Sequence, residues 1–214
     1  MRKPQCASVV CLSACLLGAP RALSAQVTIG LGPFMGYYRP FGHFEPASVY
    51  STQLASDPSQ LRGRAWGATG QLTLRRLGLE AVVSTTRSML PGAYTPGGYA
   101  PPTPARVTAA AVVGQYDLSP SPARYHLWVG AGPALVQYGE GGYARYGSPR
   151  SWGGAVGLGV TAPLWPRLEL AAAATGFAYT FDLPMPAELR PNPGSLQHGA
   201  QRDALVHLGL RWRP

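Results

Sequence analysis

The chain has 214 residues, of which 46% are hydrophobic and 13% are charged, and its formal net charge at pH 7 is +9. No apolar run reaches the roughly 20 residues that a membrane-spanning helix needs. The sequence also contains no basic helix or row of aromatic residues of the kind that binds nucleic acid, so we expect no nucleic-acid partner. A membrane protein of this composition would have to cross the bilayer as a barrel of strands.

The first segment, residues 1–25, has the pattern of a secretory signal peptide. Arg2 and Lys3 give a positively charged start, a short apolar run follows, and small residues suit cleavage after Ser24 or Ala25. We therefore expect an exported protein whose mature chain begins near residue 26.

All three cysteines lie in this leader, so the mature chain has none and holds no disulfide. The stretch from Leu12 to Cys15 resembles the lipobox of bacterial lipoproteins, which leaves lipidation of Cys15 as an alternative to ordinary cleavage. Every cation of the mature chain is an arginine, which suits anionic partners such as lipid headgroups.

Eight segments of the mature chain have strand character, because apolar residues recur at every second position and glycine and proline disfavour helix. Most are longer than the 5–6 residues usual in soluble sheets and suit a tilted membrane strand. They cover residues 27–38, 65–74, 78–86, 105–116, 125–138, 152–163, 168–181 and 203–213.

The connections between these segments alternate between long and short without exception. Three of the long ones, 39–64, 87–104 and 182–202, hold most of the prolines, whereas the short ones carry turn residues. Transmembrane barrels have this pattern, with short periplasmic turns, longer outer loops and an even strand number. The long connections are 39–64, 87–104, 139–151 and 182–202, and the short ones are 75–77, 117–124 and 164–167.

The two faces of the predicted strands differ. In the segment 66–74, Trp66, Leu72 and Leu74 share one face with two small residues, and the other face carries only glycine, threonine and glutamine. A soluble barrel places its bulky aliphatic residues inside. Here the small, uncharged face suits a narrow lumen. We therefore predict an all-β fold: an eight-stranded antiparallel up-and-down transmembrane β-barrel over residues 26–214, with its apolar face toward lipid.

Aromatic residues are predicted to form two girdles at the membrane interfaces. The outer girdle comprises Tyr37, Tyr38, Trp66, Tyr138, Trp152, Phe177 and Tyr179, and the periplasmic girdle comprises Tyr116, Tyr125, Trp128, Trp165 and Trp212. Pro33 and Pro133 fall inside predicted strands, where each removes a ladder hydrogen bond. A glycine-assisted bulge at both sites is the expected accommodation.

The leader, the eight alternating segments and the aromatic end of the last strand resemble the small outer-membrane β-barrels of Gram-negative bacteria, the OmpA-transmembrane and OmpX-like group. The resemblance implies an outer-membrane location and, as partners, outer-membrane lipids, periplasmic chaperones and the barrel-insertion machinery. It also implies an insertion signal in the last strand, where His207, Gly209 and Trp212 match the family pattern and Pro214 departs from it.

Inward-facing charges are expected to gather near the periplasmic end of the lumen. Glu169 and Arg211 fall on neighbouring strands, Glu80 falls at a similar level, and His207 lies above Arg211. Buried charges must pair or neutralise. We predict an internal Glu169–Arg211 pair within a polar cluster of Glu80, Glu169, His207 and Arg211. A structural plug is the favoured interpretation, and a gated ion path is the alternative.

The sequence gives little sign of catalysis. His43, Ser48, Ser51 and Asp57 share the first long connection, and His198 lies in the last, but nothing sets a nucleophile beside a base. The histidines have no metal-ligand spacing. We therefore predict neither catalytic residues, nor a metal, nor a cofactor.

The predicted function is that of a non-enzymatic integral outer-membrane barrel with a structural role or a binding role for its outer loops, whose ligand the sequence does not identify. Three alternatives remain open: a soluble periplasmic lipid-binding barrel, an outer-membrane enzyme that modifies lipid A, and a narrow pore.

Overall fold

A computed structural model describes the chain over residues 27–41, 61–90, 93–95, 98–120, 124–144, 148–183 and 197–214. The predicted signal peptide and the candidate lipidation site at Cys15 lie outside these residues. So do His43, Ser48, Ser51 and Asp57 of the first long connection.

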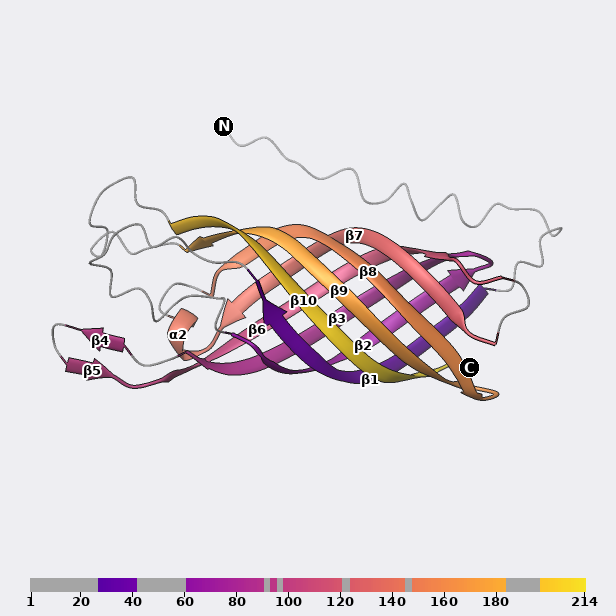
Figure 1. The fold of residues 1–214 in the computed structure, drawn as a ribbon, viewed down its shortest axis with the longest axis horizontal. Coiled ribbons are helices and arrows are strands. Elements are labelled where there is room, and N and C mark those ends of the chain that lie inside the picture. The colour runs from indigo at the N-terminus through magenta and orange to yellow at the C-terminus, as the bar shows by residue number, and fades with distance from the viewer. Residues whose placement is uncertain are drawn as a thin grey trace, which may run out of the picture.

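Eight long strands form one closed barrel, in which each strand is antiparallel to both neighbours (Figure 1). Consecutive strands pair, and the first pairs with the last to close the barrel. This arrangement confirms the predicted eight-stranded up-and-down architecture. The strands are β1 (Val27–Pro40), β2 (Gly63–Leu74), β3 (Leu77–Leu90), β6 (Thr103–Asp117), β7 (His126–Gly139), β8 (Arg150–Trp165), β9 (Leu168–Leu183) and β10 (Gln197–Trp212).

Among the described residues, three further elements lie in the connections. β4 (Ala93–Thr95) pairs with β5 (Gly98–Ala100) as a separate hairpin, and α2 (Gly141–Ala144) is a single helical turn. The sequence pattern predicted only loops there. Within the described ranges, no helix is long and apolar enough to cross a membrane.

The two ends of the barrel differ (Figure 1). The turn end carries the tight turns between β2 and β3 and between β8 and β9, together with the start of β1 and the C-terminus. The loop end carries β4, β5 and α2. Strands outgrow their predicted bounds mainly at the loop end, where β3 continues to Leu90 and β10 begins at Gln197.

The aliphatic side chains point out of the barrel. Val156 is 64% exposed, Leu208 50% and Leu72 46%, whereas the alternate positions on the same strands face the lumen. A strand turns successive side chains to opposite faces, so the period-two pattern of the sequence translates directly into this sidedness. The predicted direction of the apolar face is confirmed.

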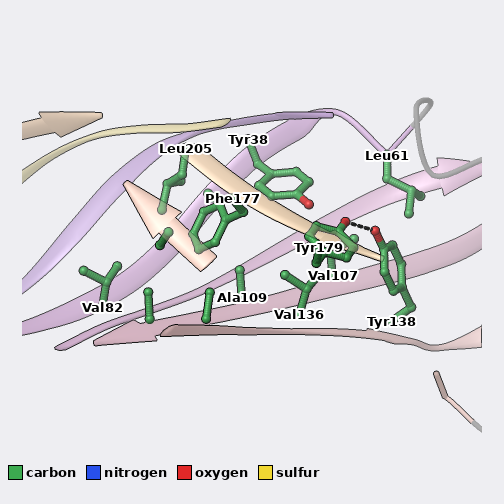
Figure 2. Close-up of a cluster of buried hydrophobic side chains, with 14 of the residues drawn as sticks. Tyr38, Leu61, Val82, Val107, Ala109, Val136, Tyr138, Phe177, Tyr179 and Leu205 are labelled. Atoms are coloured by element: carbon green, nitrogen blue, oxygen red, sulfur yellow. Dashed lines mark hydrogen bonds between the residues drawn. The ribbon is translucent and has the colours of Figure 1, made fainter. Parts of the chain in front are cut away.

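The lumen at the loop end is filled by buried aromatic and aliphatic side chains that point toward one another (Figure 2). Tyr38, Tyr138, Phe177 and Tyr179 belong to this cluster, and Trp128 is buried nearer the turn end. Their assignment to the interfacial girdles was therefore wrong, because each lies at an inward position of its strand. The other predicted girdle residues Tyr37, Trp66, Tyr116, Tyr125, Trp152, Trp165 and Trp212 are exposed on the outside.

The strand prolines interrupt the ladder without shifting its register. Pairing of β1 with β10 is unchanged on either side of Pro33, and pairing of β6 with β7 is unchanged on either side of Pro133. The expected bulges at these sites are thus absent, and the register shift lies between Pro163 and Trp165 instead. Gly32 precedes Pro33 and lies against the carbonyl of Leu210 so closely that no side chain would fit.

Candidate functional site

A ring of four polar side chains spans the lumen toward the turn end. Arg211 donates from Nη2 to Glu80 Oε2 at 2.9 Å and from Nη1 to Gln71 Oε1 at 2.5 Å. Gln115 donates to Glu80 Oε2 at 2.7 Å, and Gln71 donates to Gln115 Oε1 at 2.6 Å. The four residues come from β10, β3, β2 and β6, so the polar ring ties four strands together through their side chains.

Burial makes the ion pair in this ring costly to disrupt. The side chain of Arg211 is 2% exposed and that of Glu80 1%. Charges removed from water need a partner of opposite sign and further hydrogen bonds to offset their desolvation. The two glutamines supply these bonds, although Glu80 Oε1 and Arg211 Nε find no partner within the part of the chain that the structure describes.

The structure places all four residues of the predicted polar cluster inside the barrel, where Glu80, Glu169, His207 and Arg211 are buried. The expected Glu169–Arg211 pair does not form. These two residues are register partners on β9 and β10, yet Glu169 Oε1 binds Arg213 Nη1 at 2.8 Å. The long Arg211 side chain instead reaches past β1 and β2 to the carboxylate on β3.

His207 lies further toward the loop end on the same inward face. Its ring packs at a tilt against Phe34 with the ring centroids 4.3 Å apart, and its Nδ1 atom has no hydrogen-bond partner among the described residues. Gly209 stands between His207 and Arg211 on this face, and a side chain there would meet the carbonyl oxygen of Pro33 at 2.6 Å. His207 therefore packs as an aromatic ring and takes no part in the polar ring.

Gly30 is what allows Arg211 to cross to β2 and β3. A Cβ built on Gly30 would lie 2.6 Å from Cδ of Arg211 and 2.9 Å from its Cγ. Gly30 is the register partner of Gln71, and Gln71 is that of Glu80, so the guanidinium passes over β1 at the level of its partners. Any larger residue at position 30 would stand in its path.

We expect Gly30→Ala to destabilise the barrel by about 1–3 kcal/mol, the usual cost of forcing extra volume into a packed site. Gly114→Ala is the matched control, because its added Cβ would meet the carbonyl of Ala131 at an ordinary 3.7 Å. Urea unfolding of both variants in lipid vesicles measures the difference. Equal stability of the two variants would contradict the packing of Arg211 over Gly30.

A second buried network lies at the loop end, and Figure 2 shows one of its hydrogen bonds, between the hydroxyls of Tyr138 and Tyr179. Asp203 Oδ2 accepts hydrogen bonds from the hydroxyls of Tyr38 and Tyr179, and the hydroxyls of Tyr138 and Tyr179 bond to each other. A hydroxyl has one proton. Because Tyr179 gives its proton to the carboxylate, Tyr138 must donate to Tyr179.

This tyrosine network was not among the predictions from the sequence, although the sequence contains a signal for it. Asp203, His207 and Arg211 are four residues apart, so all three share the inward face of β10. Of these three residues, the predicted polar cluster included only His207 and Arg211. Tyr38, Tyr138 and Tyr179 occupy inward positions by the same rule, and tyrosine hydroxyls are natural donors to a buried carboxylate.

Loss of the Tyr179 hydroxyl should destabilise the barrel more than loss of the Tyr138 hydroxyl. Tyr179→Phe removes a hydrogen bond to a carboxylate, for which we expect about 1.5–3 kcal/mol, whereas Tyr138→Phe removes a neutral bond with an expected cost of about 0.5–1.5 kcal/mol. Urea unfolding in vesicles ranks the two variants. The opposite order would show that Tyr179 is not the donor to Asp203.

A cavity of about 350 Å³ opens at the turn end of the lumen. Gln71 and Gln115 of the polar ring line it, together with Asp117, His126 and Arg213. His126 Nδ1 and Asp117 Oδ2 lie 2.8 Å apart at its mouth. Its lining also includes Arg75 and Arg76, so three arginines and one aspartate face the cavity, and the polar ring lies beyond it along the barrel.

The described residues contain no group of three or more His, Cys, Asp or Glu side chains that could hold a metal ion. His126 and Asp117 lie far along the barrel from His207. Of the residues weighed above as possible catalytic groups, His198 falls in β10, but its side chain lies outside the described set.

The closed eight-stranded barrel, its outward apolar face and its filled lumen define the class: this chain has the fold of the small eight-stranded outer-membrane β-barrels. No protein-family model matches the sequence, and no curated protein matches it either.

Solved structures of outer-membrane barrels are similar to this chain in fold. Neisserial surface protein A aligns with a TM-score of 0.55 and 12% identity, covering 86% of this chain and 96% of that one. The outer membrane protein OprG from Pseudomonas aeruginosa aligns with a TM-score of 0.55 and 11% identity, covering 87% and 95%. Outer Membrane Protein W of E. coli aligns with a TM-score of 0.48 and 15% identity, covering 90% of this chain and 100% of that one. At these identities the likeness concerns the fold alone.

Proposed function

We propose that this protein is a non-enzymatic integral barrel of the outer membrane of a Gram-negative bacterium. The observation that carries the proposal is the exposed apolar band around the barrel, which includes Val156, Leu158 and Leu208. Monomeric soluble proteins rarely leave so large a continuous apolar surface in water. In a bilayer the same surface faces hydrocarbon, and the closed barrel leaves no strand edge unpaired.

Exposed aromatic residues border this band at both ends, which supports the orientation. Tyr37, Trp66 and Trp152 lie toward the loop end, and Trp165 and Trp212 lie at the turn end. Tyrosine and tryptophan are enriched at both interfaces of a membrane. Short turns face the periplasm in such barrels, so the loop end is outside the cell and both ends of the barrel chain are in the periplasm.

The lumen argues against a soluble periplasmic lipid-binding barrel. Such a protein needs a roomy apolar interior for its ligand. Here the interior holds a cluster of packed aromatic rings at the loop end and a polar ring around Arg211 and Glu80 toward the turn end.

A structural role, or binding through the outer loops, fits a filled lumen best. The two solved structures with a TM-score of 0.55 are named a surface protein and an outer membrane protein, which is consistent with this role. A narrow pore is the second candidate, favoured by the cavity of about 350 Å³ at the turn end. Conduction would require the polar ring and the Tyr138–Tyr179 cluster to move aside.

Export and assembly are part of the proposal. Residues 1–25 serve as the signal peptide, periplasmic chaperones deliver the chain, and the insertion machinery reads β10 through His207, Gly209 and Trp212. In the folded barrel Trp212 is exposed at the turn end and pairs in register with Leu31, so β10 is also the strand that closes the barrel.

Cell fractionation with a heat-modifiable gel assay tests the proposal. The protein is expected in the outer-membrane fraction, released only by detergent, and its gel migration should change on boiling. Recovery from the periplasm without detergent would overturn membrane residence. Single-channel recording of the purified barrel then separates the two candidate roles, since steady conductance would favour the pore. Unchanged lipid A mass on expression is expected, and a mass shift would favour an enzyme.

A further inference from the structure

Five arginines lie side by side on the outer surface of the barrel at its loop end. Arg64, Arg87 and Arg106 form an arginine row across β2, β3 and β6, and all three are exposed. Arg87 and Arg106 are register partners. Arg64 precedes Ala65, whose partner is Thr86, so Arg64 lies opposite Arg87.

Two more arginines extend this surface. They are Arg39 and Arg62, at the loop end of β1 and β2. Tyr38 and Gly63 are register partners on these strands. Arg39 follows Tyr38 and Arg62 precedes Gly63, so the two arginines lie beside each other. The described outward positions of β1, β2, β3 and β6 carry no acidic side chain. The patch therefore collects positive charge from four neighbouring strands.

Like charges directly opposite each other destabilise a sheet. One carboxylate relieves the patch only in part: Glu140 Oε1 lies 3.5 Å from Nε of Arg87 and 3.3 Å from Nη1 of Arg106. Glu140 takes a left-handed backbone with φ 65°, which is uncommon for a residue other than glycine. Arg64 has no acidic partner among the described residues.

The depth of the arginine row matches a lipid headgroup. Trp66 lies two residues inside Arg64 on the same face of β2, and Tyr37 lies two residues inside Arg39 on β1. Two strand residues rise about 6.6 Å. The arginines thus begin one step beyond the aromatic residues that sit at the membrane interface, where the headgroups of the outer leaflet lie.

We infer that the arginine row binds a lipid headgroup of the outer leaflet that carries more than one phosphate. Neighbouring strands are about 4.8 Å apart, so Arg64 and Arg106 are separated by roughly 10 Å, enough for a headgroup to bridge. A guanidinium fork binds phosphate oxygens with two parallel hydrogen bonds. The phosphates supply the negative charge that Glu140 alone does not. This inference rests on the proposed membrane residence.

The test uses the barrel refolded into phosphatidylcholine vesicles with or without bis-phosphorylated lipid A at about one part in ten. We compare the natural protein, the row variant R64Q/R87Q/R106Q and the control variant R75Q/R76Q/R167Q, which loses three exposed arginines at the turn end. Heat-modifiable gel migration after heating gives the unfolding temperature. Lipid A is expected to raise it by about 5 °C in the natural protein and the control, and by less than half as much in the row variant.

Each other outcome has a definite meaning. An equal rise in all three proteins would overturn the inference. A rise with inorganic phosphate alone, abolished in the row variant, would replace the lipid with a free anion. If the row variant does not fold, R87Q alone and the charge-retaining R64K/R87K/R106K are measured, and an undiminished rise in both overturns the inference. Release of the folded natural protein from the vesicles without detergent would contradict membrane residence instead.

Discussion

Arg211→Leu is expected to destabilise the folded barrel by about 3–5 kcal/mol, because it leaves the Glu80 carboxylate buried without a cation. The same change removes the hydrogen bond to Gln71. The free energy of unfolding in urea, measured in phosphatidylcholine vesicles, gives the size of the effect. Replacing both charges, as in Glu80→Leu with Arg211→Leu, should recover most of the loss, since no unpaired charge then remains.

Glu169→Gln is the control that separates the observed pairing from the one first expected. Glutamine keeps the size of the Glu169 side chain and an oxygen that can accept from Arg213, whose side chain is 27% exposed and can turn to water, so we expect a loss below about 1 kcal/mol. A loss from Glu169→Gln as large as that from Arg211→Leu would reinstate Glu169 as the partner of Arg211. An Arg211→Leu variant of unchanged stability would remove the polar ring from any structural role.

The architecture was predictable because it depends on features that a sequence displays directly. A period of two marks a strand wherever one face is apolar, and the alternation of long and short connections orders the strands as up-and-down neighbours. Neither feature needs knowledge of side-chain contacts. The hairpin of β4 and β5 lacked both signals, since its strands have only three residues each.

The aromatic residues show where the same reasoning stopped short. Tyr37 and Tyr38 are adjacent, so they point to opposite faces, yet both were assigned to the outer girdle. Tyr37 is exposed and Tyr38 is buried beside Asp203. Position near a strand end suggested a membrane interface, but strand parity decides the face. Whether a residue occupies an odd or an even position of its strand therefore predicts its face better than its distance from the strand end does. This parity can be read from the sequence.

The partner of Arg211 was beyond sequence reasoning for a different reason. Register correctly places Glu169 opposite Arg211, but an arginine side chain is long enough to reach two strands further around a narrow barrel. The direction of the Arg211 side chain depends on the space left by Gly30 and on the hydrogen-bond acceptors that Gln71 and Glu80 provide. This space and these acceptors come together only in the closed barrel. The stagger of its strands is not specified by the pattern of apolar residues.

The distribution of arginine joins these observations into one account. Arg211 is buried in the lumen and ion-paired, whereas the arginines of the arginine row, Arg64, Arg87 and Arg106, lie outside at the loop end. Between the exposed aromatic residues Trp152 and Trp165 of β8, the outward positions carry no charge. A protein whose outer surface met only water would have no reason to keep charge out of that band.

The strongest test of this account is an arginine placed in the middle of the band. Leu158 is exposed on β8, six residues from Trp152 and seven from Trp165. Leu158→Arg should cost about 2–4 kcal/mol in a bilayer, since the charge then lies near the midplane, and Leu74→Arg at the turn end of β2 should cost only about 0–1 kcal/mol. Urea unfolding in vesicles measures both variants.

The dependence on depth is the decisive feature of this prediction. Both positions are exposed leucines on the outer face, so local packing alone gives no reason for a large difference between them. In water an exposed arginine is tolerated at either position, because a surface substitution away from special features changes stability by about 0.5 kcal/mol or less. A large cost at Leu158 with a small cost at Leu74 therefore requires hydrocarbon around the barrel. Equal and small costs would place the apolar band in water and contradict membrane residence.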